Sequence, residues 1–175
     1  MGSTLIVDEI QGATAATKVK MPAGSILQTL SSTGLTQQST TSSSYVDVSG
    51  LSVTITPFFN TSKILITVHV YASYTDAGML KIVRGSTRIP NNTQGSTEER
   101  RGFAMVRHGA SNEGNMYSFT HLDNPATTSA TTYKVQALRQ GGSGDLCINR
   151  RNWNSDYSLT SSITVQEIAQ WVLYS

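Results

Sequence analysis

Cysteine is almost absent from this chain, which has a single one, Cys147, among 175 residues. An intramolecular disulfide is therefore impossible, and cysteine cannot supply the several ligands of a zinc cluster. Leu146 and Ile148 flank Cys147 in the sequence. We therefore expect Cys147 to act as a small hydrophobic residue within a strand.

Charged side chains are also scarce, at 14% of the residues against about 25% in typical soluble domains. The formal net charge is only +2, without a block of lysine or arginine, so we expect no nucleic-acid partner. No apolar run approaches the ~18 residues of a membrane-spanning helix, and the N-terminus lacks a charged segment followed by an apolar one. We therefore expect neither membrane insertion nor a signal peptide.

Motifs of catalysis and of metal or cofactor binding are missing as well. His69, His108 and His121 do not have the close spacing of paired metal ligands. The sequence contains no nucleophile elbow, phosphate-binding loop or dinucleotide fingerprint. We accordingly expect no metal, no cofactor and no enzymatic activity.

Carboxylates are spread over the expected loops, at Asp76, Glu98, Glu99, Asp123 and Asp156. A glycosidase needs two carboxylates that face each other across a cleft. Nothing in the spacing of these residues brings two of them together. A glycan-cleaving enzyme is therefore the least favoured of the functional alternatives.

Serine, threonine, glycine and asparagine replace the missing charge, as is typical of short strands joined by many turns. The clearest pattern spans residues 62–73, where every second residue is apolar and mostly β-branched. This stretch has no internal glycine or proline, and Leu65 and Tyr71 lie on its second face, so we expect a central strand. Residues 51–56 alternate in the same way before Pro57, which predicts an antiparallel hairpin with 62–73.

Turn signals divide residues 26–175 into about eight to ten short strands. Glycines at 141–144 predict a tight connection, from which residues 145–149 pair back onto a strand at 131–138. The predicted fold class is all-β, an antiparallel β-sandwich of jelly-roll type. The residues expected to be buried together are Ile64, Ile66, Val68, Val70, Val53, Ile55, Val135 and Val165.

Residues 1–25 differ from the body, because they have little to bury against one another. They nevertheless contain the apolar cluster Leu5, Ile6, Val7 and Ile10. Such a cluster is unusual in a free tail. We therefore interpret residues 1–25 as an N-terminal arm that attaches the chain to a partner.

The loop at residues 150–157 is the strongest candidate for ligand contact, because it contains Arg150, Arg151, Trp153 and Tyr157. Aromatic rings and arginines of this kind stack on sugars or anchor protein contacts. The alternative, given equal weight, is a loop in which Trp153 covers the core.

Several stretches resemble virion proteins of marine and freshwater tailed phages, those of the cyanophage type. They are STLIVDEIQG at 3–12, YVDVSGLSVTITP at 45–57, TTSATTYKVQ at 127–136 and SITVQEIA at 162–169. The resemblance implies a non-enzymatic structural protein of the virion, usually a tail fibre or fibre-like protein that contacts the host surface. It supplies no catalytic residues. Because fibre proteins often carry a long shaft and only about 25 residues precede this body, a capsid decoration protein remains the alternative.

The resemblance also implies a homotrimer, whose other partners are tail or capsid proteins and a host-surface glycan or protein. The residues add an argument of their own, because the body has more apolar positions than one face per strand requires. Around a three-fold axis, heterologous contacts close into a ring. The residues expected at this interface are Leu65, Tyr71, Leu138, Trp171 and Leu173.

Overall fold

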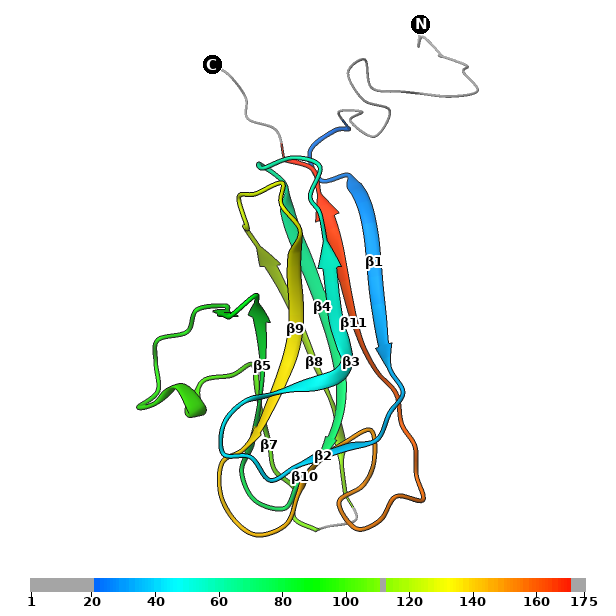
Figure 1. Ribbon diagram of the computed structural model, residues 1–175, viewed down its shortest axis with the longest axis vertical. Helices are drawn as coiled ribbons and strands as arrows, with labels where there is room; N and C mark the ends of the chain where they lie inside the picture. Colours follow the sequence, from blue (N-terminus) through cyan, green and yellow to red (C-terminus); the bar gives the residue numbers. More distant parts are fainter. Residues whose placement is uncertain (1–20, 111–112, 171–175) are drawn as a thin grey trace, which may run out of the picture.

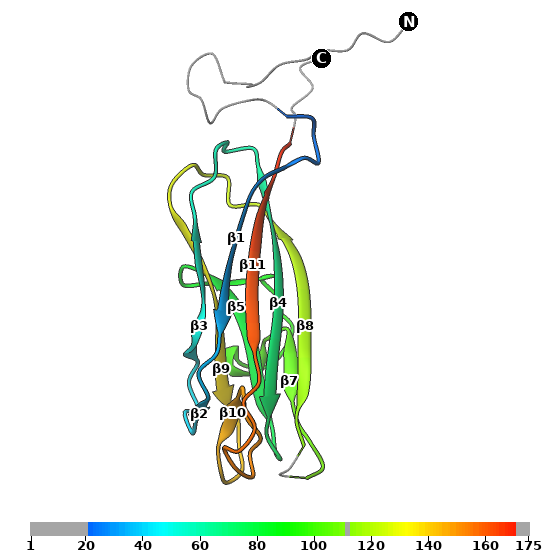
Figure 2. The same cartoon turned by 90° about the vertical axis from the view of Figure 1, so that its right-hand side faces the viewer.

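The computed structural model describes residues 21–110 and 113–170, and these form an almost purely β-structure. Two antiparallel sheets pack face to face as a long sandwich (Figures 1 and 2). In the described ranges the helical structure is limited to one short 3-10 turn, η1 (Glu98–Arg100), and no helix is long and apolar enough to cross a membrane. The predicted all-β sandwich is confirmed.

The first sheet has six strands, and β4 lies at its centre, paired with β11 on one edge and with β8 on the other. The end of β4 also pairs with the short strand β10. The expectation of a central strand is thus confirmed. The strands of this sheet are β1 (Ile26–Gly34), β11 (Ser161–Ile168), β4 (Lys63–Ser73), β8 (Asn115–Asp123), β10 (Leu146–Ile148) and β2 (Gln38–Thr40).

The second sheet has five strands and runs in the order β3, β9, β5 and β6, with β7 also paired to β5. Its members are β3 (Val46–Ile55), β9 (Thr131–Arg139), β5 (Gly78–Arg84), β6 (Thr87–Ile89) and β7 (Ala104–Val106).

The core fills the space between the sheets, because each long strand turns alternate residues inward. The eight residues expected to be buried together all belong to this core cluster. Burying a Val, Leu or Ile side chain stabilises a fold by roughly 1.5–3 kcal/mol. Cys147 is buried in β10 as expected, and burial raises the pKa of its thiol.

The predicted hairpin of residues 51–56 with 62–73 is wrong. β3 pairs with β9 in the second sheet, whereas β4 belongs to the first. The turn after Pro57 therefore carries the chain across the sandwich, so that Ile55 and Ile64 join the core from opposite sides. The alternating pattern identified both strands, but it does not specify the neighbour with which a strand pairs.

The expected pairing of residues 145–149 with 131–138 is wrong for the same reason. β9 lies in the second sheet, and β10 pairs with β2 and β4 in the first. The glycines at 141–144 thus connect two sheets and do not form a hairpin turn. Gly142 and Gly144 both have positive φ, which glycine adopts without a steric penalty.

The outward face of β5 is covered by the chain between β6 and β7, which projects to one side of the sandwich in Figure 1. Phe103 N–H donates a hydrogen bond to Leu80 O at 2.8 Å, which fixes the end of this excursion against β5. Met79 on the covered face is buried, and so is Leu138, its partner on β9. The expectation that Leu138 lines a subunit interface is therefore wrong, because its own chain already buries it.

The described chain starts and finishes at the same end of the sandwich, where Gly24 N–H donates to Ala169 O at 2.9 Å. The loop between β10 and β11 lies at the opposite end (Figures 1 and 2). The arm residues Leu5, Ile6, Val7 and Ile10 are outside the described residues, as are Trp171 and Leu173.

Candidate functional site

The loop that joins β10 to β11, residues 149–160, forms the tip of the sandwich, and we call it the tip loop. Asn149 opens the loop with a φ of 60°, a left-handed conformation that asparagine tolerates better than most residues. Its backbone oxygen accepts a hydrogen bond from Leu159 N–H at 2.9 Å. The two ends of the loop are thereby held together.

The side chain of Asn149 ties the tip loop to the first sheet, and it is buried. Its amide nitrogen donates to Gly34 O at 2.8 Å and to Thr36 O at 3.1 Å. Its amide oxygen accepts from Ser161 Oγ at 2.5 Å. Buried polar groups with all these bonds rigidify a loop, so the tip loop has a firm base.

Further along, backbone and amide contacts hold the tip loop against its neighbours. Asn152 N–H donates to Ser73 Oγ at 3.1 Å, and its amide nitrogen donates to Asp145 O at 2.9 Å. Gln37 reaches across from the β1–β2 connection and donates to Ser155 O at 2.9 Å and to Tyr157 O at 3.2 Å. The exposed part of the loop is therefore supported on both sides.

The aromatic side chains of the tip loop face solvent. Trp153 is 71% exposed and Tyr157 is 53% exposed. The alternative in which Trp153 covers the core is thus wrong. An indole that is so exposed on an anchored loop is available for contact with a partner.

The two arginines of the tip loop have different surroundings. The guanidinium carbon of Arg151 lies 3.8 Å from the centroid of the Tyr157 ring, a cation–π contact that brings two predicted site residues together. Arg150 instead turns toward Asp145, with Arg150 Nη2 4.0 Å from Asp145 Oδ2. Its Nη1 donates a hydrogen bond to the backbone oxygen of Arg151. Of the four predicted residues, Trp153 and Tyr157 therefore form the exposed surface, and the half-buried Arg151 and Arg150 support it.

Three of the five carboxylates considered for glycan cleavage, Asp76, Asp123 and Asp156, lie in different surroundings. Asp123 is buried, and it accepts hydrogen bonds from Arg84 at 2.7 Å and from Tyr133 Oη at 2.7 Å. Asp156 lies in the tip loop and accepts a hydrogen bond from Asn154. Asp76 lies between β4 and β5, beside Gly142 of the connection from β9 to β10. The fold does not bring these three carboxylates together into one cleft.

The histidines are also dispersed. His69 bonds to Ser118 Oγ at 2.8 Å on the outward face of the first sheet, whereas His121 stacks on Phe119. His108 is buried, and its Nε2 lies 3.3 Å from Tyr117 Oη. Across residues 21–110 and 113–170, no three histidine, cysteine or acidic side chains are grouped so that they could hold a metal ion.

Sequence reasoning missed a second polar cluster, formed by Lys81, Arg88, Glu98 and Arg101 beside Tyr45. A signal was present, because Lys81 interrupts the apolar residues of a strand and Arg88 lies in a short strand next to it. The residue that joins them, Glu98, lies in a loop, and no periodicity places a loop over a particular strand.

Comparison of the sequence with protein-family models and with curated proteins finds no match.

Proposed function

We propose that this chain is a non-enzymatic structural protein of a bacteriophage virion, a fibre-like homotrimer whose tip loop contacts the host surface. The observation that carries this proposal is the position of the tip loop. The segment between β10 and β11 lies at the end of the sandwich opposite the start of β1 (Figure 2), and it carries the exposed Trp153 and Tyr157. An attachment arm at one end and an aromatic surface at the other suit a protein that links a particle to a host.

The outward face of the first sheet supports the trimer part of the proposal. Its ladder positions on β1, β11, β4 and β8 carry mostly serine, threonine and glutamine with a few apolar residues. Among the described residues at these positions Lys63 is the only charged one, so identical copies meet little repulsion there. Leu65 and Leu122 pair directly across β4 and β8, as do Tyr71 and Met116. We call this surface the neutral face.

Tyr71 and Leu65 were expected at the subunit interface, and both lie on the neutral face. Burial raises the pKa of Tyr71, and the nearby charge of Arg151 opposes that rise. The neutral face thus reaches the tip loop at the end of the face where Tyr71 lies. Trimer contacts along this face leave the tip loop at the outer end of the assembly.

The location of the chain in an electron-microscopy map of the whole particle tests the proposal. A position in a tail fibre, with residues 149–160 pointing outward, is the expected result. A position on the capsid shell would instead favour the alternative, a decoration protein, and absence from the particle would exclude both roles.

Binding of the purified, labelled full chain to cells of the host bacterium tests the role of the tip loop. Trp153→Ala combined with Tyr157→Ala should reduce binding at least about tenfold, because aromatic anchors supply much of the energy of such contacts. Met105→Ala is the matched control, because it removes an exposed apolar side chain on β7. Equal loss in the control would contradict the assignment to the tip loop.

A further inference from the structure

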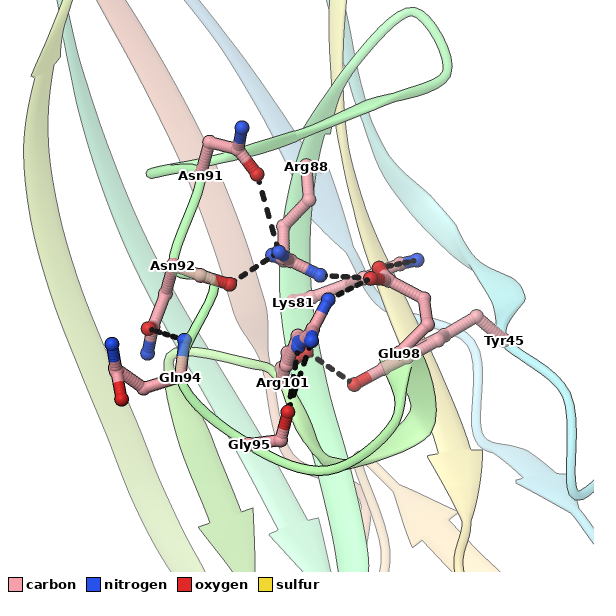
Figure 3. Close-up of polar contacts among 9 residues, drawn as sticks. All are labelled: Tyr45, Lys81, Arg88, Asn91, Asn92, Gln94, Gly95, Glu98 and Arg101. Atoms are coloured by element: carbon pink, nitrogen blue, oxygen red, sulfur yellow. Dashed lines mark hydrogen bonds and ion pairs between the residues drawn. The ribbon is translucent and has the colours of Figure 1, made fainter.

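Three cationic side chains converge on one carboxylate above the outward face of β5 (Figure 3). Arg88 Nη1 donates a hydrogen bond to Glu98 Oε2. Lys81 Nζ lies 3.4 Å from Glu98 Oε1, and Arg101 Nη1 lies 3.7 Å from Glu98 Oε2. We call these four residues the Glu98 cluster.

Two of the three cations of the cluster are buried, Arg101 is half-buried, and the carboxylate is exposed. The side chain of Arg88 is 6% exposed and that of Lys81 is 10% exposed, whereas that of Glu98 is 48% exposed. Lys81 and Arg88 come from the strands β5 and β6, whereas Glu98 belongs to the short turn η1 on the overlying loop. Two of the three positive charges are thus fixed in the sheet, whereas Glu98 and Arg101 lie on the loop above it.

The cluster has an excess of positive charge, because three cations and one carboxylate leave a net charge of +2. The adjacent Glu99 and Arg100 have opposite charges and are both exposed, so they do not change this balance. Burying charge without compensation is costly. The fold therefore maintains more positive charge at this point than Glu98 alone neutralises.

Arg88 has a further unused donor. Its Nη2 donates to Asn91 Oδ1 at 3.2 Å and to Asn92 O, but its buried Nε has no hydrogen-bond partner. An anion that replaced Glu98 at the guanidinium would take over the hydrogen bond from Nη1, because Nη2 is held by Asn91 and Asn92.

The surroundings of the cluster indicate the rest of the ligand. The exposed residues Asn91, Asn92 and Gln94 follow β6 next to Arg88 (Figure 3). Carboxamides both donate and accept hydrogen bonds, which suits hydroxyl groups. Tyr45 lies beside the cluster, with its ring 3.9 Å from Lys81 Nζ and its Oη donating to Arg101 O at 2.8 Å. Burial, and then the charge of Glu98, raise the pKa of Tyr45, so that this donor stays protonated.

We propose that the Glu98 cluster is a binding site for an acidic saccharide, whose carboxylate displaces the side chain of Glu98 from Arg88 and Lys81. When no ligand is bound, the carboxylate of Glu98 accepts the hydrogen bonds of Arg88 and Lys81 in place of the ligand's carboxylate. The site lies on the flank of the second sheet and is distinct from the tip loop. It goes beyond the proposed function and does not depend on the chain being a virion protein.

Titration calorimetry on the purified full chain with a galacturonic acid trisaccharide tests the proposal. A neutral galactose trisaccharide and inorganic phosphate are the other two probes. We expect the uronate to bind, the neutral sugar not to bind, and phosphate to bind more weakly because it lacks the hydroxyl contacts. Binding should weaken as salt is added, since the contact is charged. Equal binding of phosphate and uronate would overturn the saccharide assignment, and no uronate binding would overturn the site.

Two pairs of variants locate the site. Glu98→Gln removes the internal competitor and should tighten uronate binding on the order of tenfold, whereas Glu99→Gln, its exposed neighbour, should not. Arg88→Gln should abolish binding and Arg100→Gln should leave it almost unchanged. If Arg88→Gln fails to fold, the first pair still decides, because equal affinities of Glu98→Gln and Glu99→Gln would refute the displacement. Trp153→Ala should bind the uronate as the unaltered chain does, which separates this site from the tip loop.

Discussion

The carboxylate of Glu167 accepts hydrogen bonds from the backbone N–H of Phe58 at 2.9 and 3.1 Å, which links the turn between the two sheets to strand β11. The same carboxylate accepts from Phe59 N–H at 3.3 Å and from the side-chain nitrogen of Gln28 at 2.6 Å. Glu167 is completely buried, next to the inward residue Ile64 on β4. It therefore fixes the turn that makes β3 and β4 members of different sheets.

Glu167→Ala should lower the free energy of unfolding by about 1–3 kcal/mol, because it leaves buried N–H donors without an acceptor. Glu167→Gln should cost less, since the amide oxygen still accepts. Urea denaturation gives both values. Gln166→Ala is the control on the opposite face of β11, and it should change stability by about 0.5 kcal/mol or less. Equal effects at the two positions would show that the carboxylate does not hold the turn.

Val68→Asp should prevent folding, because it would place an unpaired charge in the middle of the core. Val68→Ala should fold but lose about 1–3 kcal/mol through the cavity that it leaves. Ser52→Asp puts the same charge on an exposed position of β3 and should fold normally. Far-ultraviolet circular dichroism distinguishes the three outcomes. A native β-spectrum for Val68→Asp would contradict the position of this residue.

Asn149→Ala should destabilise the chain by about 3 kcal/mol, because it removes three buried hydrogen bonds and puts alanine in a left-handed conformation. Trp153→Ala, four residues later, should change stability by about 0.5 kcal/mol or less, since its side chain faces solvent. Thermal unfolding of the two variants measures the difference. A large loss for Trp153→Ala would mean that the indole packs on the body after all.

The free energy of unfolding should fall in acid, partly because Asp47 becomes protonated. Burial alone would raise its pKa, but hydrogen bonds from Lys134 and Gln136 and the charge of Lys134 outweigh it and lower the pKa. Because the pKa is lower in the folded chain, this contribution is present above the ordinary aspartate pKa and is lost as the pH falls below it. Asp47 is exposed, so we expect about 1 kcal/mol or less.

Urea midpoints measured from pH 7 down to pH 3 check this effect. Asp47→Asn should flatten the acid side of the profile slightly, and Lys134→Gln should flatten it by a similar amount. The double variant should add nothing further, since both substitutions remove the same ion pair. Additive effects of the two substitutions would show that the pair is not the source.

The full-length chain should be a trimer at micromolar concentration, as light scattering coupled to size exclusion measures. Thr164→Glu puts a charge in the middle of the neutral face, where it would have to be desolvated at the interface, and should shift the chain toward monomer. Ser52→Glu makes the same charge change on the second sheet and should leave the trimer intact. A stable monomer of the unaltered chain would refute the trimer.

The sequence alone determined the all-β class, the inward residues of β3 and β4 and the candidate loop. Alternation at Ile64, Ile66 and Val68 requires one buried face, whichever strand lies beside it. Likewise, the composition of residues 150–157 predicts a surface for contact, of which the structure exposes Trp153 and Tyr157.

Only the tertiary structure decided which strands pair and which outward faces are covered. The alternation of β3 and β4 suits a hairpin and a crossing between sheets equally well, and the buried carboxylate of Glu167, more than a hundred residues away, selects the crossing. In the same way, the sequence predicts an exposed position for Leu138, which is buried in the folded chain. Glu98 meets Arg88 and Lys81 for the same reason, because contacts between residues far apart in the chain follow from packing and leave no period in the sequence.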